Sequence, residues 1–238
     1  MNRAFAIARR EFSSYFYSPI AYVVIVAFLL ASGAAFYRDF EPGQAAAMRS
    51  TLDWMVWFLV VIVPVLSMGL LAQEWASGTI ETLMTAPVND SEVVLGKFAG
   101  NLGLLIVMLV PTLLYVALLF IYARPDFGPI FSGYLGIILV GSLFISVGLF
   151  CSSMTRNQIV AVVIAILILS LATVVPYLMA QFANLRPWIR RAVDQAVYRR
   201  YSDFSRGVMS TGNIAFFVLA TAVFLFLTVK VLESRRWK

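Results

Sequence analysis

The sequence predicts an all-α, polytopic membrane protein, and its composition and apolar runs both support this fold class. Of the 238 residues, 61% are hydrophobic and only 13% are charged, with a mean hydropathy of +0.89. A soluble domain carries about 25% charged residues. Apolar runs of about 17–25 residues, the length that crosses a bilayer as a helix, recur along the chain. We expect six spans, at roughly 20–36, 54–72, 98–122, 131–154, 158–182 and 214–229.

The residue types that are absent exclude several kinds of site. The chain has no histidine, which excludes a Ser-His-Asp triad and a histidine-ligated metal. Cys151 is the single cysteine and lies in an apolar run, so we expect a packing residue and no internal disulfide. The net charge of +6 favours lipid headgroups over nucleic acid, because aromatic-basic repeats are also missing.

Residues 1–18 have the pattern of an amphipathic helix that lies in the membrane interface. The apolar positions recur with helical spacing at Phe5, Ala8, Phe12, Tyr15 and Phe16. Arg3 and Arg10 fall on the other side, toward anionic headgroups. The alternative is a disordered basic tail. Pro19 separates this segment from the first span.

Residues 73–97 form a polar segment between spans 2 and 3. Gly78 and Thr79 can break a helix and cap the next one, which would place Glu81 in its first turn, where a carboxylate suits the helix dipole. The expected short helix has an apolar edge and a proline stop, formed by Ile80, Leu83, Met84 and Pro87. Asn89 to Ser91 then make a turn and a second cap before Glu92. The sharper interpretation is a surface helix that offers its apolar edge to a partner; the alternative is a solvated loop.

Proline, small and aromatic residues mark the spans. Pro64, Pro111 and Pro176 are expected to kink spans 2, 3 and 5. The glycine pairs Gly96/Gly100 and Gly141/Gly148 allow close helix approach, either in a seam between subunits or in ordinary internal packing. Several aromatic residues suit interfacial anchoring or bundle packing equally: Trp54, Trp57, Tyr115, Tyr122 and Tyr177.

Residues 183–212, between spans 5 and 6, mix apolar positions at helical spacing with arginines. We expect one or two helices that lie in the outer interface or re-enter it. An outer lid would consist of Trp188, Arg190, Arg191, Arg199 and Arg200. The alternative is that these arginines only anchor the chain at the outer surface.

Charge distribution bears on orientation and on energy supply. Each side of the membrane would carry nine basic residues, but without 183–212 the count becomes nine against three, which favours cytoplasmic termini. Within the predicted spans there is no Asp, Glu, Lys or Arg, so the spans offer no ionisable side chain that could relay protons or bind a coupling ion. A pathway without charged groups suits a lipid-linked, amphipathic or extended substrate better than a small ion. Residues 91–98 lack the first glycine and the Ser/Thr of a phosphate loop, so another subunit must supply energy for uphill transport.

These features together resemble the type-2 (ABC-2) ABC transporter permeases over nearly the whole chain. The motif E-x-x-x-G-T-x-E-x-L-x-x-x-P is matched by Glu74, Gly78, Thr79, Glu81, Leu83 and Pro87. Within the family the chain is similar to permeases of the gliding-motility type, through residues 201–207 (YSDFSRG) and 232–237 (LESRRW).

The resemblance implies one permease domain over residues 1–238, with a cytoplasmic coupling helix after span 2. It implies two kinds of partner in the inner membrane: a cytoplasmic ATP-binding subunit that carries ATP and Mg²⁺, and a second permease copy or a homologous or auxiliary subunit. No catalytic, cofactor or metal site is then expected in this chain, and the family does not specify the substrate.

Three functions compete. The first is the permease of an ABC exporter. The second is a membrane scaffold or assembly factor that an ABC ATPase drives mechanically without moving a solute. The third, an intramembrane enzyme, is disfavoured by the lack of histidine and of acidic residues in the predicted spans. ATP-driven accumulation of substrate in vesicles would separate the first two.

Overall fold

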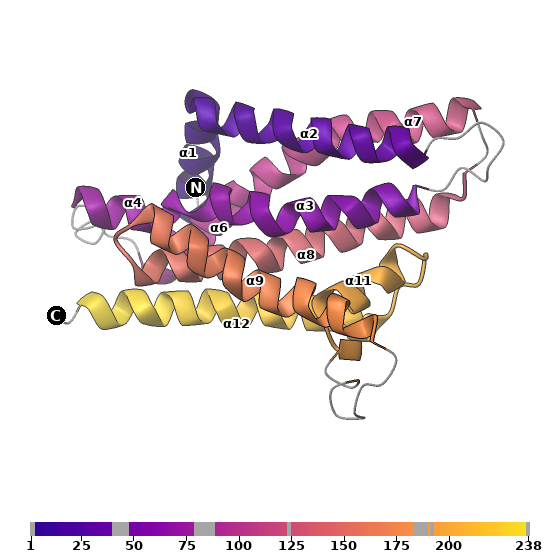
Figure 1. Ribbon diagram of the computed structural model, residues 1–238. Helices are drawn as coiled ribbons and strands as arrows, with labels where there is room; N and C mark the ends of the chain where they lie inside the picture. The colour runs from indigo at the N-terminus through magenta and orange to yellow at the C-terminus, as the bar shows by residue number, and fades with distance from the viewer. Residues whose placement is uncertain are drawn as a thin grey trace.

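A computed structural model describes residues 3–39, 48–78, 89–122, 125–182, 190 and 193–236, and no β-strand occurs among them. Long helices lie side by side in a bundle, with one short helix set across its end (Figure 1). Six helices have the length and hydropathy to cross a membrane: Pro19–Arg38, Arg49–Ser77, Asp90–Tyr122, Phe127–Met154, Gln158–Ala180 and Thr211–Ser234. The predicted all-α class and the six spans are therefore confirmed.

The elements follow the chain in a simple order. Helix α1 (Arg3–Tyr17) is the short helix that lies across the end of the bundle, and α2 (Pro19–Asp39) is the first candidate span. The second and third candidate spans are each made of joined pieces, namely α3 (Arg49–Ser67) with α4 (Gly69–Ser77), and α6 (Asp90–Leu109) with η1 (Val110–Thr112) and α7 (Leu113–Tyr122). They are followed by α8 (Phe127–Met154), α9 (Gln158–Ala180), α11 (Val197–Phe204) and α12 (Thr211–Arg236).

Helix α8 is the centre of the bundle and the most buried of the six candidate spans. Its glycines leave room for neighbouring side chains: a Cβ at Gly141 would overlap Leu105 of α6, and one at Gly148 would overlap Ser67 of α3. Of the two alternatives for this glycine pair, internal packing is the one that the structure shows. Cys151 is buried in the same helix, as expected for a packing residue.

The three prolines act differently. Pro111 lies in the 3₁₀ turn that joins α6 to α7, where it interrupts the helix as predicted. Pro64 lies inside α3, and the break follows at Met68, between α3 and α4. Pro176 lies inside α9, which continues to Ala180.

The helices extend beyond the predicted spans, and these extensions carry charged residues. Asp53 lies in α3, Glu74 in α4 and Lys97 in α6. The predicted spans, 54–72 and 98–122, end within two residues of these positions. A helix can continue through a charged residue whose side chain finds a partner inside the protein, and Lys97 does so.

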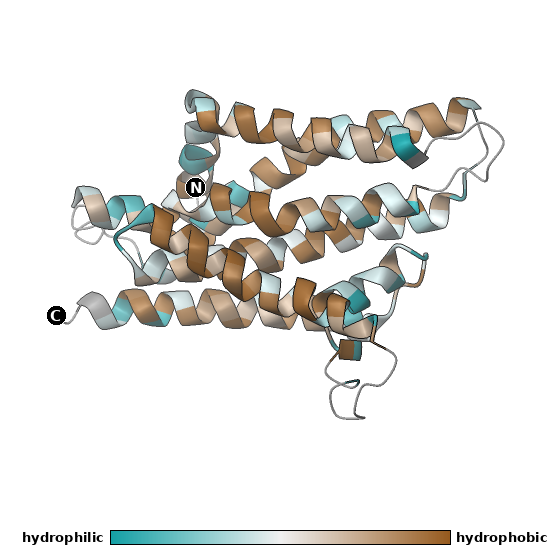
Figure 2. Ribbon diagram, in the orientation of Figure 1, coloured by the Kyte–Doolittle hydropathy of each residue, from teal (hydrophilic) through white to brown (hydrophobic). Residues whose placement is uncertain are grey.

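Different helices lie at the two ends of the bundle. Both termini lie at one end, together with α1 and α4, whereas α11 lies at the opposite end (Figure 1). Brown, hydrophobic ribbon dominates the middle of the long helices, and teal residues gather near their ends (Figure 2). This pattern matches a bundle whose helices cross a bilayer along their length.

Candidate coupling site

The predicted coupling segment joins the bundle at the end where the termini lie. Glu74 is in α4, and Gly78 ends that helix in the left-handed conformation (φ 73°), which a residue with a Cβ adopts only at a cost. The chain is next described at Asn89, whose backbone N–H donates to the Glu92 carboxylate at 2.9 Å, so the predicted second cap is confirmed. The remaining predicted coupling residues lie outside the described part of the chain: Thr79, Ile80, Glu81, Leu83, Met84 and Pro87.

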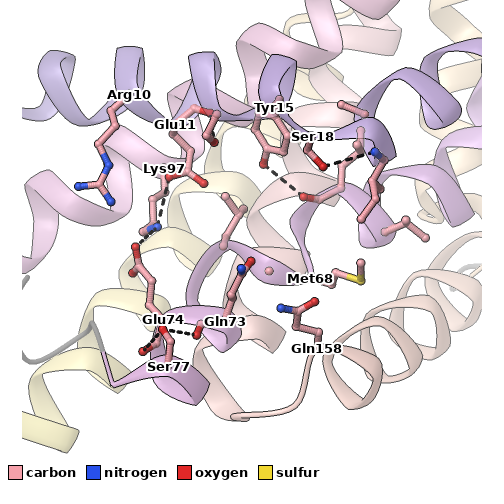
Figure 3. A pocket seen from close by; sticks show the side chains of 17 residues that line it. Arg10, Glu11, Tyr15, Ser18, Met68, Gln73, Glu74, Ser77, Lys97 and Gln158 are labelled. Atoms are coloured by element: carbon pink, nitrogen blue, oxygen red, sulfur yellow. Dashed lines mark hydrogen bonds and ion pairs between the residues drawn. The ribbon is translucent and has the colours of Figure 1, made fainter.

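Lys97 is the centre of the charged cluster at this end. Its side chain is buried, and its ammonium lies 2.8 Å from a Glu74 carboxylate oxygen and 3.4 Å from one of Glu11. Because these residues belong to α6, α4 and α1, one cation joins three helices (Figure 3). A buried charge without partners is costly, so each carboxylate helps to hold Lys97 in place.

Helix α1 packs on the glycine face of α6. A Cβ at Gly96 would lie 2.7 Å from the Ile7 side chain, and one at Gly100 would lie 2.8 Å from the Cβ of Glu11. Gly103 continues this face, 3.0 Å from the Phe12 ring by the same measure. The first glycine pair thus also serves internal packing, and the contact brings Glu11 within reach of Lys97.

The predicted amphipathic helix at the N-terminus is present, and part of its predicted apolar face, including Phe12 and Tyr15, contacts the rest of the protein. Ile7 and Glu11 contact α6, whereas Phe5 is 62% exposed. Phe12 and Phe16 are half-buried and pack edge to face at 5.1 Å, while Arg3 and Arg10 are exposed. The sequence analysis missed Glu11, although it is the one acidic residue in 1–18 and lies a helical turn beyond Ile7.

Two hydroxyl groups fix the pieces of the second span. The Ser152 hydroxyl of α8 donates to Met68 O at 2.7 Å and accepts the N–H groups of Leu71 and Ala72 at 3.1 and 2.9 Å. It therefore stands inside the hydrogen-bond ladder at the joint between α3 and α4. The Tyr15 hydroxyl of α1 donates to Leu66 O at 3.2 Å, and burial raises its pKa well above the ordinary value, so it remains a donor.

A pocket of about 630 Å³ opens between α1, α4 and the start of α9 (Figure 3). Its polar lining is drawn from these helices, from α6 and from Ser18 between α1 and α2, and comprises Arg10, Glu11, Ser14, Tyr15, Ser18, Gln73, Glu74, Ser77, Lys97 and Gln158. Glu11, Glu74 and Lys97 form part of its wall, so the pocket lies beside α4, the helix at whose end the described part of the coupling segment stops.

The predicted lid residues are at the opposite end. Arg190 and Arg199 are exposed, whereas Trp188 and Arg191 lie outside the described residues. Arg200 is not free for headgroups: it donates to Asn213 Oδ1 at 3.2 Å and lies 4.2 Å over the Phe216 ring. The connection re-enters the bundle through α11, in which Tyr201 and Phe204 are wholly buried.

Comparison with known proteins gives one matching family model and two similar curated proteins. A family model described as "ABC-2 family transporter protein" matches residues 9–173, which include Glu11, Glu74 and Lys97. Two relatives, both described as "Probable multidrug ABC transporter permease YbhS", come from Escherichia coli strains K12 and O157:H7. Each is 27% identical over 192 residues, which cover 75% of this chain and 47% of the relative. The chain thus spans about half the length of the curated relatives it matches.

Proposed function

The chain belongs to the ABC-2 transporter family, and on this premise we propose that it is the permease subunit of an ATP-driven exporter. A separate cytoplasmic subunit binds ATP and Mg²⁺ and hydrolyses the nucleotide. This chain supplies the membrane part and receives the movement of that subunit through residues 73–97.

The observation that carries the proposal is the attachment of both ends of the coupling segment to the bundle. The end at Gly78 is held through α4, by Ser152 at its joint and by the ion pair of Glu74 with Lys97. The end at Asn89 begins α6, which carries Lys97 and packs on α1. Because Lys97 links the two ends, a force on residues 79–88 moves α4, α6 and α1 together.

Residues 79–88 themselves make the contact with the ATP-binding subunit. Ile80, Leu83 and Met84 enter an apolar groove on that subunit, and Glu81 favours the start of the short helix. Glu74 acts differently, because its partner in the structure is the internal Lys97.

The membrane arrangement follows from the same end of the bundle. We propose the inner membrane as the location, with the coupling segment and both termini cytoplasmic, supported by the basic-residue count of nine against three. A second copy, or a homologous or auxiliary subunit, completes the route across the membrane. The exposed Arg190 and Arg199 of the 183–212 connection then face the outer leaflet.

Membership in the gliding-motility group of permeases is a further part of this proposal. Its support is the residue segment 201–207, which includes the buried Tyr201 and Phe204 of α11. This segment also ends in Gly207 at φ 87°, a left-handed position that favours glycine.

Site-directed cross-linking tests the docking and the orientation together. In a Cys151→Ser background, Leu83→Cys and Met84→Cys are expected to cross-link to the ATP-binding subunit when the two are produced together. Ser210→Cys is the matched control, because Ser210 directly precedes α12 at the opposite end of the bundle. Cross-links from position 210, or their absence at both 83 and 84, would contradict the proposal.

A further inference from the structure

An aromatic pocket lies at the end of the bundle opposite the termini. It measures about 390 Å³, within the range of small-molecule sites. Its lining residues come from the first part of α3, the last part of α9 and α11. Its lining consists of Ser50, Asp53, Trp54, Trp57, Val174, Tyr177, Leu178 and Tyr198.

Three rings from three different helices meet at this pocket. Trp57 of α3 lies 4.9 Å from Tyr177 of α9 and 4.7 Å from Tyr198 of α11, measured between ring centroids. Tyr177 and Tyr198 are 5.2 Å apart and nearly perpendicular, at 81°. Burial raises the pKa of Tyr198 to about 12, so its ring remains a neutral phenol. Such rings present electron-rich faces that attract a cation.

A carboxylate is part of the same lining. Asp53 is half-buried, and its Oδ1 is buried without a hydrogen-bond partner in the described parts of the chain. The nearby Arg49 and Arg206 are both exposed, and neither forms an ion pair with Asp53 among the described residues. The carboxylate therefore keeps unused capacity to accept a positive charge.

We propose that this pocket binds an organic cation of the quaternary-ammonium class. The faces of Trp57, Tyr177 and Tyr198 contact the alkyl groups of the cation, and Asp53 supplies the opposite charge. Among the residues that the structure describes, no Lys or Arg lines the pocket, so these residues offer an anion no partner. The site goes beyond the proposed function, because binding requires no ATP-binding subunit.

The chain already makes a contact of this kind beside the pocket. The guanidinium of Arg38 lies 5.3 Å from the ring centroid of Trp54, and Trp54 is one of the residues that line the pocket. Cation–aromatic attraction is therefore in use at this end of the bundle, and the proposed ligand extends it to the next group of rings.

The test compares two probes of the same shape. Choline and its neutral isostere 3,3-dimethylbutan-1-ol are titrated by saturation-transfer NMR against the purified full chain in phosphatidylglycerol nanodiscs. We expect choline to bind about tenfold more tightly than the neutral isostere, because the charge supplies both the aromatic and the ionic attraction. Equal binding of the two probes, or no choline binding, would overturn the proposal.

Variants locate the binding in this pocket. Asp53→Asn keeps the side-chain shape and is expected to weaken choline binding about tenfold, and Trp57→Leu to a similar extent. Asp126→Asn is the matched control: Asp126 caps α8 at the same end, does not line this pocket, and should leave binding unchanged. Tyr177→Leu tests the aromatic wall independently, should Trp57→Leu fail to fold. Unchanged affinity in Asp53→Asn and in the folded aromatic variants would refute the site.

Changing the lipid of the nanodiscs distinguishes a cation that is part of a membrane lipid from one that comes from the aqueous phase. If a choline headgroup from the membrane is the natural occupant, nanodiscs made with phosphatidylcholine will suppress the binding of free choline. If binding is the same in both lipids, the occupant is a cation from the aqueous phase. Either result fits the proposed class of ligand and assigns its origin.

Discussion

Replacing Lys97 by methionine removes the cation that joins α1, α4 and α6. The side chain of Lys97 is 3% exposed, while those of Glu11 and Glu74 are 17% and 16% exposed. Breaking a fully buried ion pair by removing one partner costs about 3–5 kcal/mol. In Lys97→Met the two carboxylates lose their partner and repel each other. Because both retain some access to water, we expect the free energy of unfolding to fall by the lower part of this range, about 3 kcal/mol.

The assay is unfolding of the full chain in detergent, followed by the fluorescence of its five tryptophans. Lys230→Met is the matched control, because Lys230 pairs with Glu233 at 2.7 Å but both side chains are about half exposed, so its loss should cost about 0–1 kcal/mol. Adding Glu11→Gln and Glu74→Gln to Lys97→Met should recover much of the loss, since no unpaired charge then remains. The reasoning is refuted if Lys97→Met costs no more than Lys230→Met, or if the added substitutions recover nothing.

Two further substitutions test the contacts around the cluster. Gly100→Ala should destabilise the protein by about 1–3 kcal/mol, because the new Cβ would lie 2.8 Å from that of Glu11 and 3.0 Å from Ala8 O; protease accessibility of α1 should rise. Gly212→Ala, with its nearest atom at 3.6 Å, should have little effect, and equal effects of the two would contradict the packing. Ser152→Ala should cost about 1–3 kcal/mol in the same unfolding assay, since it leaves the joint at Met68 without its hydroxyl bridge. Ser142→Ala, which removes one bond to its own helix, should be milder, and a reversed order would count against the role of Ser152.

Much of the fold was predictable from the sequence, because the signals are local. Apolar runs identified the six spans, and the position of Pro111 predicted the interruption between α6 and α7. Asn89 and Glu92 have the spacing of a capping box, and the structure forms it. Each of these features depends on residues within a few positions of one another.

The contacts between distant segments were not predictable in the same way. The glycine pair Gly96/Gly100 indicates close approach but does not specify the partner, which is α1. Asp53 and Lys97 each directly precede a predicted span, and the apolar runs do not indicate that each lies within a longer helix. Burial of Tyr201 and Phe204 depends on the room left by Gly136 of α8, 65 or more residues away in the chain. Such pairings arise from tertiary packing, which periodicity does not encode.

The most direct test of the proposed coupling is the ATPase activity of the complex formed with the ATP-binding subunit, reconstituted with Leu83→Asp. We predict that this substitution abolishes assembly or the dependence of ATP hydrolysis on the permease, because a charge would be buried in an apolar interface at a cost of several kcal/mol. Leu83→Met is the matched control and should retain both properties, since it keeps an apolar side chain of similar volume. An intact complex whose ATP hydrolysis remains fully coupled in Leu83→Asp would contradict the account.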